Sequence, residues 1–346
     1  MSHLAKGRNV IHNGNFNVWQ RGTSFAAAAS TQYLADRWRY AFSNDGVVTI
    51  AQDTGVPTVS SQYSIKVSCT TADASIGAGQ YSLVRHIIEL ADWTNIIYGR
   101  PWVLSFWVKS FQTGVFCVAF RETAGGTASY VAEYTINASA TWEKKTIQIP
   151  HPTIGTWNAG GVVNGGVMAF EFMLSMGSNF QTAPNVWTAA DKYCTSNQTN
   201  FFSSTNNYIQ FSQVQLEAGT AATEFDALVY ADELARCQRY LVALGGEAAY
   251  ERFGAGYCSS TTDMRVMIPL PVKMRAIPAK TITTASNFGC YAALNVIAAT
   301  AIDFSWGTTS SASLAITVAS GLTAGQGSIF CANNQTTDRL YLSAEI

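Results

Sequence analysis

The sequence predicts an all-β protein, because its apolar residues recur mostly at every second position, as they do along half-buried strands. The segments with this spacing are joined by connections rich in Gly, Asn, Ser and Thr, without amphipathic helices between them. Such connections suit a jelly roll or Greek key better than a simple meander. We therefore expect an N-terminal jelly-roll β-sandwich over 1–226, a short linking helix over 227–245, and a smaller C-terminal β-sandwich domain over 246–346.

Five segments of the N-terminal region carry the strand pattern in turn. They are 64–69, 101–110, 114–120, 146–149 and 167–176. In the last of them Glu171 and Ser175 lie on one face, and the other face is apolar throughout, with Met168, Phe170, Phe172 and Leu174. Each segment therefore predicts a strand that turns one face toward a core.

Two local features predict how these strands are arranged. Segments 101–110 and 114–120 are separated by a short Gln-Thr-Gly turn, so we expect them to pair as a hairpin. In the later segment NYIQFSQVQLE the apolar positions switch from odd to even numbers between Phe211 and Val214. A β-bulge near Ser212 would account for this change of phase.

One helix is predicted, beginning near Tyr230 and ending at Gly245 and Gly246, with Asp232 and Glu233 in its first turn, where they complement the macrodipole. Its apolar residues follow a three-four-three spacing and are Leu234, Cys237, Leu241 and Leu244. A stripe this narrow suits docking onto a sheet or packing against other copies of the chain around a symmetry axis.

The strand pattern resumes after Gly246. Three prolines punctuate 264–284 and confine that stretch to sheet edges, bulges or strand starts. The segments SLAITVAS and LYLSAEI, nearer the C-terminus, alternate cleanly. These features predict the second, smaller β domain.

Composition limits the classes of function. A chain of 346 residues with 48% apolar side chains is long enough for two buried cores. Charged residues make up only 12%, and the net charge of -1 provides no basic surface for phosphate groups, so nucleic acid is not an expected partner. The N-terminus lacks the apolar core of a signal peptide, and the best interior apolar run, near 292–302, is too short to span a bilayer. No membrane insertion is expected.

The seven cysteines are odd in number and scattered along the chain, without the spacing of a metal knuckle or a redox pair. We interpret them as free, mostly buried small apolar residues. This use of cysteine fits folding in a reducing cytoplasm.

The sequence assigns no catalytic residue and no metal ligand. Four histidines are dispersed, and the patterns H-E-x-x-H, G-x-S-x-G and the P-loop are absent from the sequence. We therefore predict that the chain is not an enzyme. Glycoside hydrolysis stays the alternative, because its two carboxylates are brought together by the fold and have no recognisable spacing.

Several segments carry a family resemblance. Near the start are NGNFNVWQRGTSF (13–25) and ADRWRY (35–40), and ahead of the C-terminal domain are QVQLEAGTAATEF (213–225) and LARCQRYL (234–241). Further on are IPLPVKMRAIPAKT and the closing SAEI. Together these segments resemble tail-fibre and related receptor-binding or structural proteins of tailed bacteriophages and prophages.

The resemblance implies a carbohydrate-binding-module-like jelly roll that is joined by a helix to a C-terminal β domain. It also implies a virion protein, on the tail or another exterior structure, made in the host cytoplasm and commonly assembled as a homotrimer. Expected partners are further copies of the chain, other virion proteins and host-surface polysaccharide, and no cofactor is expected. A structural calcium ion would suit such a module, but no D-x-D-x-D-G loop in the sequence supports one.

Five aromatic residues receive roles. Trp157, Trp187 and Tyr193 lie in two long Gly/Asn-rich connections, where their rings either stack on a sugar or anchor the loops by packing. Trp19 and Trp38 lie inside the N-terminal motifs and are expected in the structural core.

Two functions follow from these observations. In the first, the protein is a tail fibre that recognises host-surface glycan by non-catalytic binding, with avidity from several copies on each particle. In the second, it is a purely architectural virion component, such as a head-decoration, adaptor or baseplate protein, that binds only other virion proteins.

Overall fold

The structure is a computed structural model that describes residues 8–94, 99–123, 125–157, 164–292 and 294–346. The chain divides into two compact units. The larger unit extends to Glu233 and includes Ile346, and the smaller unit runs from Leu234 to Glu345. The division falls between the expected boundaries at 226 and 246, within the segment predicted to link the domains.

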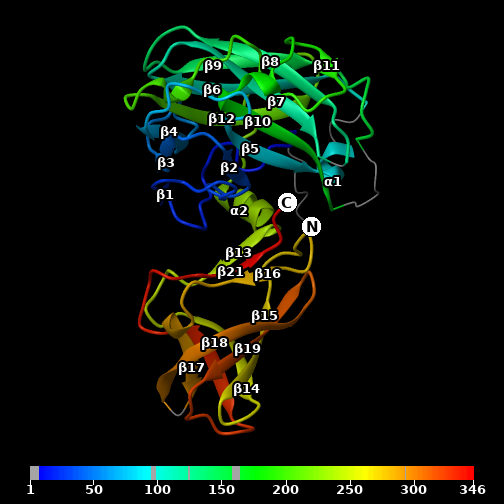
Figure 1. The fold of residues 1–346 in the computed structure, drawn as a ribbon. Helices are drawn as coiled ribbons and strands as arrows, with labels where there is room; N and C mark the ends of the chain where they lie inside the picture. The colour runs from blue at the N-terminus through cyan, green and yellow to red at the C-terminus, as the bar shows by residue number, and fades with distance from the viewer. Residues whose placement is uncertain (1–7, 95–98, 124, 158–163, 293) are drawn as a thin grey trace. The chain divides into compact units, whose positions relative to one another are not determined.

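Two six-stranded antiparallel sheets make up the described part of the larger unit (Figure 1). The first has the order β1 (Ser24–Phe25), β3 (Val47–Asp53), β4 (Ser64–Thr71), β12 (Tyr208–Ala218), β6 (Trp102–Ser110), β9 (Glu143–Ile149). The second has the order β11 (Trp187–Thr188), β8 (Ser129–Ile136), β7 (Gly114–Glu122), β10 (Gly166–Met176), β5 (Tyr81–Glu89), β2 (Trp38–Phe42). The chain crosses repeatedly between the two sheets, as it does in a jelly roll.

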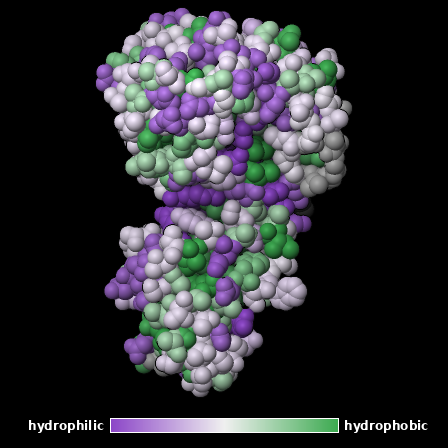
Figure 2. Space-filling view, viewed as in Figure 1, coloured by the Kyte–Doolittle hydropathy of each residue, from purple (hydrophilic) through white to green (hydrophobic). Residues whose placement is uncertain are grey.

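The two sheets share one apolar core. In β10 the alternating residues Met168, Phe170, Phe172 and Leu174 all belong to it. Phe172 stacks on Phe211 of β12, with ring centroids 4.0 Å apart, and meets Phe106 of β6 at 5.0 Å. Polar and apolar residues are intermixed on the surface of this unit that Figure 2 shows. The predicted all-β class and the jelly-roll sandwich are confirmed.

The hairpin expected between 101–110 and 114–120 was wrong. β6 pairs with β12 and β9 in the first sheet, whereas β7 pairs with β8 and β10 in the second. The short turn between them carries the chain across the sandwich, and Gly114 adopts a φ of 132° that favours glycine. Because the chain crosses here, the apolar faces of both strands are buried in the same core. A hairpin would have placed the two strands in one sheet.

The bulge predicted near Ser212 is confirmed. The register between β12 and β6 shifts between Ser212 and Gln215, and Gln213 has a φ of 51°. The inserted residue restores the inward direction of the side chains, so that Phe211 and Val214 both reach the core.

A closed barrel forms most of the smaller unit. Its strands follow one another in the order β14 (Arg252–Cys258), β15 (Asp263–Pro269), β19 (Ser311–Val318), β18 (Asn295–Gly307), β17 (Phe288–Ala292), β20 (Gly327–Ala332). A three-stranded sheet completes it, with the order β13 (Leu241–Leu244), β21 (Leu340–Ser343), β16 (Ala279–Thr281). The unit is built mainly of strands, as predicted, but its main sheet closes into a barrel where a sandwich was expected. The closure leaves this sheet without a free strand edge.

The linking helix ends earlier than predicted. Helix α2 covers Tyr230–Gln238, which includes Leu234 and Cys237. Leu241 and Leu244 instead lie in strand β13, which pairs with β21. Of the four residues predicted to form an apolar stripe on one helix, only Leu234 and Cys237 are therefore helical. The sequence LVAL satisfies a helix or a strand equally well, and pairing with β21 decides in favour of the strand.

The remaining helical elements are short. Within the described ranges they include α1 (Leu90–Asp92) and the 3-10 turns Ser178–Phe180, Phe201–Ser203 and Ala285–Asn287. No helix in the described part of the chain has the length and apolarity that a bilayer-spanning segment needs.

The prediction for the cysteines is confirmed, because all seven are free and buried. Burial raises the pKa of the Cys117 thiol to about 11 and that of Cys194 and Cys290 to about 12. These thiols therefore stay protonated at neutral pH and pack as apolar groups.

Candidate functional site

The aromatic residues expected in the loops fall into two places. Trp157 is buried, with 5% of its surface exposed, and Trp187 is half-buried. Their rings meet edge to face, with centroids 5.2 Å apart. The connection that follows Trp157 lies partly outside the described residues, at 158–163.

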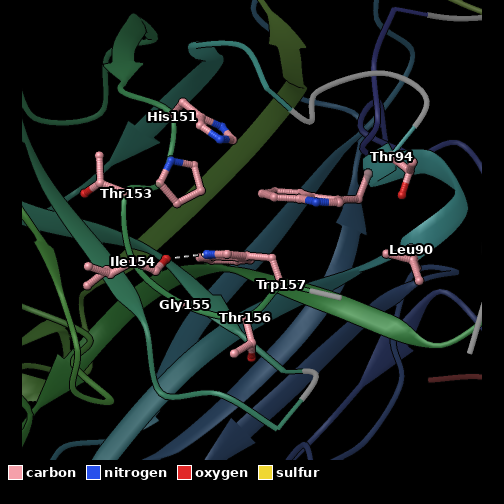
Figure 3. Close-up of a pocket in the computed structure, with 10 residues that line it drawn as sticks. Leu90, Thr94, His151, Thr153, Ile154, Gly155, Thr156 and Trp157 are labelled. Atoms are coloured by element: carbon pink, nitrogen blue, oxygen red, sulfur yellow. Dashed lines mark hydrogen bonds between the residues drawn. The ribbon is translucent and has the colours of Figure 1, made fainter. Parts of the chain in front are cut away.

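Packing and hydrogen bonds hold both tryptophans. Trp157 stacks on Trp93, with ring centroids 5.0 Å apart and an interplanar angle of 13°, and its indole Nε1 donates to the carbonyl of Ile154 at 2.6 Å (Figure 3). Trp187 donates from Nε1 to the carbonyl of Pro150 at 2.9 Å and meets the buried ring of Trp102 at 5.8 Å. In this arrangement the two indoles anchor their loops by packing. Of the two roles that the sequence allows for these rings, sugar stacking and loop anchoring, the contacts correspond to the second.

Tyr193 lies in a different cluster. The guanidinium of Arg121 stands 3.9 Å from the centre of its ring, and Phe180 meets the ring edge to face at 5.2 Å. Arg121 also forms ion pairs with Glu171 and Asp191. The structure thus brings Trp157 and Trp187 together and places Tyr193 with buried charges on the other face of the second sheet.

A hollow lies next to the stacked indoles (Figure 3). Its volume is about 260 Å³, and its lining consists of Leu90, Trp93, Thr94, His151, Pro152, Thr153, Ile154, Gly155, Thr156 and Trp157. Three threonine hydroxyls and one imidazole supply hydrogen-bonding groups, and the lining contains no carboxylate, lysine or arginine side chain. Trp93 is only 1% exposed, and its indole N–H has no hydrogen-bond partner among the described residues.

The buried carboxylate of Glu122, at the end of β7, fixes one wall of this hollow. Its Oε1 accepts hydrogen bonds from the backbone N–H of Thr156 at 2.9 Å, the Thr156 hydroxyl at 2.8 Å and the backbone N–H of Trp157 at 2.6 Å. A carboxylate with three donors holds the loop firmly, because charge-assisted hydrogen bonds are among the stronger ones in proteins.

Gly155 is required at its position in the same wall. Its φ is 95°, and a Cβ there would lie 2.5 Å from the indole Nε1 of Trp157 and 2.9 Å from the Cβ of Ala128. Only glycine tolerates both the backbone conformation and the close approach. The wall is therefore a built feature of the sandwich.

The charged residues next to Tyr193 are held together by ion pairs. Glu171 is 0% exposed, and its two carboxylate oxygens accept from Arg85 Nε at 2.6 Å and Arg121 Nε at 2.7 Å. Burial raises its pKa, but the two guanidinium groups outweigh burial and leave the pKa below its ordinary value. The described residues hold no group of three or more His, Cys, Asp or Glu side chains that would suit a metal ion.

No family model and no curated protein matches the chain. Among solved structures, it is similar to the enzymatically active domain of tailspike protein 4 of bacteriophage CBA120, at 15% identity and a TM-score of 0.34. The match covers 61% of this chain and 21% of that one, so the chain spans about a fifth of the tailspike domain.

Two further structures are similar over most of their own length. A putative sugar binding protein from Bacteroides thetaiotaomicron matches at 12% identity and a TM-score of 0.36, over 61% of this chain and 100% of that one. The family 11 carbohydrate-binding module from Clostridium thermocellum matches at 11% identity and a TM-score of 0.31, over 58% and 98%. These likenesses are too distant to carry a functional argument, so function is inferred from the geometry of the chain itself.

Proposed function

We propose that this protein binds glycan without chemical turnover, and that the hollow beside Trp93 is a saccharide site. The observation that carries the proposal is the lining of that hollow: hydroxyl and imidazole groups, the Pro152 ring and a buried indole N–H without a partner among the described residues. Sugars present many hydroxyls and small apolar patches, which such a lining matches. At 260 Å³ the hollow lies just below the usual range of roughly 300–1,000 Å³ for ligand sites, which suits one sugar ring or a chain end.

The finer proposal is that the chain is a tail fibre on the exterior of a virion, assembled as a homotrimer. The motifs at 13–25 and 213–225 support the virion assignment through their resemblance to phage tail-fibre proteins. Several copies on one particle would turn weak binding at each hollow into strong adsorption.

A second candidate, the architectural virion component, is favoured by one feature of the barrel. Met267 of β15 and Trp306 of β18 are 64% and 78% exposed, and both lie in register with Ser313 of the strand between them, β19. Large apolar side chains that are exposed on one sheet are typical of protein contact surfaces, whether the contact is with another protein or with a further copy of the chain. Hydrophobic residues are also visible on the face of this unit shown in Figure 2.

We predict that Thr153→Trp weakens glycan binding at least about tenfold, equivalent to ~1.4 kcal/mol. Thr153 is exposed and lines the hollow, so an indole there fills the space without disturbing the core. The measurement is binding to an array of bacterial surface oligosaccharides, followed by titration of each one bound. Thr135→Trp is the matched control, because Thr135 is exposed on β8 and does not line the hollow.

Two results would count against the saccharide site: equal binding by both variants, or no binding by the unmodified protein. Alanine substitutions at Trp157, Trp187 and Tyr193 would not serve the same purpose, because these side chains pack against other residues of the unit.

The assembly is tested separately by sedimentation. We predict that the unmodified protein sediments with the mass of three chains, and that the double variant Met267→Ser, Trp306→Ser sediments as one chain. The reason is that both side chains would leave water only on association. A single-chain mass for the unmodified protein would contradict the trimer, and a trimeric double variant would show that this surface is not the contact.

A further inference from the structure

Two neighbouring hollows lie on the barrel of the smaller unit, apart from the site described above. Their volumes are about 500 and 570 Å³, and they share Tyr291 and Leu294 in their linings. The first is also lined by Tyr250, Arg252, Asn295, Val296, Cys331 and Asn333. The second is also lined by Ala255, Gly256, Ala292, Gln326, Gly327, Ser328 and Ile329.

Three paired strands of the barrel, β14, β20 and β17, contribute residues to the first hollow. Arg252 of β14 and Gly289 of β17 both pair with Cys331 of β20. Cys331 lines this hollow and is buried, with 2% of its surface exposed.

Arg252 gives the first hollow its chemical character. Its guanidinium lies 5.0 Å from the centre of the Tyr291 ring, and Arg252 forms no ion pair with any described residue. Arg252 is exposed, so its N–H groups are accessible to a ligand. Neither hollow has an aspartate or glutamate in its lining, so an incoming anion meets no opposing carboxylate there.

The other polar groups in the first hollow are suited to a sugar. Asn295 and Asn333 supply amides that donate and accept, and Tyr250 is 53% exposed and offers a ring for stacking. A peptide is disfavoured, because the closed barrel has no free strand edge to which an extended chain would add. Each hollow also lies within the roughly 300–1,000 Å³ that is usual for small-ligand sites.

We propose that these hollows form a second saccharide site, for an anionic saccharide. The acidic group of one sugar pairs with Arg252, and the sugar chain continues past Tyr291 into the second hollow. Guanidinium groups match the geometry of carboxylate and phosphate groups with two parallel hydrogen bonds. The site differs from the hollow beside Trp93 in its unit and in its ligand, because the lining there contains no lysine or arginine side chain.

The test uses the full chain and three probes in calorimetric titrations: a trimer of galacturonic acid, the neutral trimer of galactose, and inorganic phosphate. The unmodified protein is expected to bind the acidic trimer at least about tenfold more tightly than the neutral one. Arg252→Gln is expected to remove this preference. Arg265→Gln is the matched control, because Arg265 lies on the neighbouring strand β15, donates to Ser305 and does not line either hollow.

Two outcomes would overturn the proposal directly: equal binding of the acidic and neutral trimers, or an Arg252→Gln variant that keeps the preference for the acidic trimer. A third is phosphate binding as tight as that of the acidic trimer, because it would mean that the site binds anions without recognising the sugar. Thr153→Trp separates the two proposals. If this variant loses the acidic trimer, binding occurs at the hollow beside Trp93, and the second site fails while the first stands. If it keeps the acidic trimer and loses only neutral glycan, both sites are supported.

Discussion

Glu171→Ala is expected to destabilise the larger unit by about 3–5 kcal/mol, because removing one partner of a buried ion pair leaves the other charge without compensation. Glu171 is fully buried, and its carboxylate accepts from both Arg85 and Arg121. The substitution therefore leaves the buried guanidinium of Arg121 and the partly buried one of Arg85 without this carboxylate. The measurement is chemical unfolding followed by near-ultraviolet circular dichroism.

Asp53→Ala is the control for this substitution. Asp53 pairs with Lys66 at 3.6 Å, but both side chains are about one-third exposed, so the loss is expected to be about 1 kcal/mol or less. Equal costs for the two variants would contradict the view that burial makes the Glu171 cluster important.

The same carboxylate predicts how stability depends on pH. Burial raises the pKa of Glu171, the two arginines lower it further than burial raises it, and the folded-state pKa lies below its ordinary value. The contribution is therefore fully present above the pKa of the unfolded chain, about 4.3, and is lost as the pH falls through the folded-state value. Stability should decline below about pH 4, and the Glu171→Ala variant should show a shallower decline.

Sequence periodicity predicted the strands well, because a strand with one buried face shows apolar residues at every second position of its own sequence. The alternation in β10 placed Phe170 and Phe172 inward, and the change of phase near Ser212 located the bulge. The sequence of a strand does not show in the same way which other strand it pairs with. The turn before Gly114 is short enough for a hairpin, yet the chain crosses to the other sheet because both flanking strands have apolar faces to bury.

Burial on the second face of a sheet is also hidden from local pattern. Glu171 alternates with core residues, so it was expected on the face of β10 that points away from the core, and it lies there. That face is also buried, because a second apolar cluster packs on it. Tyr193, from a distant connection, packs with the cluster there. A polar residue in a strand indicates the face away from the core and does not show whether another segment covers it.

The candidate site shows the same limit. Trp157 and Trp187 were identified from their loops, but their contact with each other across 30 positions follows from the fold. Trp93 and Glu122, which shape the hollow, stand in no motif and no repeat, so single-sequence reasoning had no signal for them. Residue type predicted aromatic groups in loops, and the fold determined which of them pack and which line a hollow.

Trp38→Ala is expected to cost the larger unit about 3–5 kcal/mol, in the range of large-to-small substitutions at buried tryptophans. Trp38 is 0% exposed, stacks on Phe172 at 6.2 Å and lies 5.0 Å from Phe16, centroid to centroid. Its indole Nε1 also donates to the carbonyl of Asn13 at 3.2 Å. One side chain therefore joins the N-terminal motif to the centre of the core.

The loss should extend into that motif. The Asn13 side chain donates to the carbonyls of Val18 and Asp36 and accepts from the backbone N–H of Val18, so it holds the segment in its turns. Once the indole is removed, the Val18 amide should exchange its hydrogen with solvent faster than in the unmodified protein. Trp142→Ala, at a half-buried position, is the control and should change neither quantity much. If the Val18 amide stays as protected as before, then Asn13 orders the segment on its own, and Trp38 contributes only to the core.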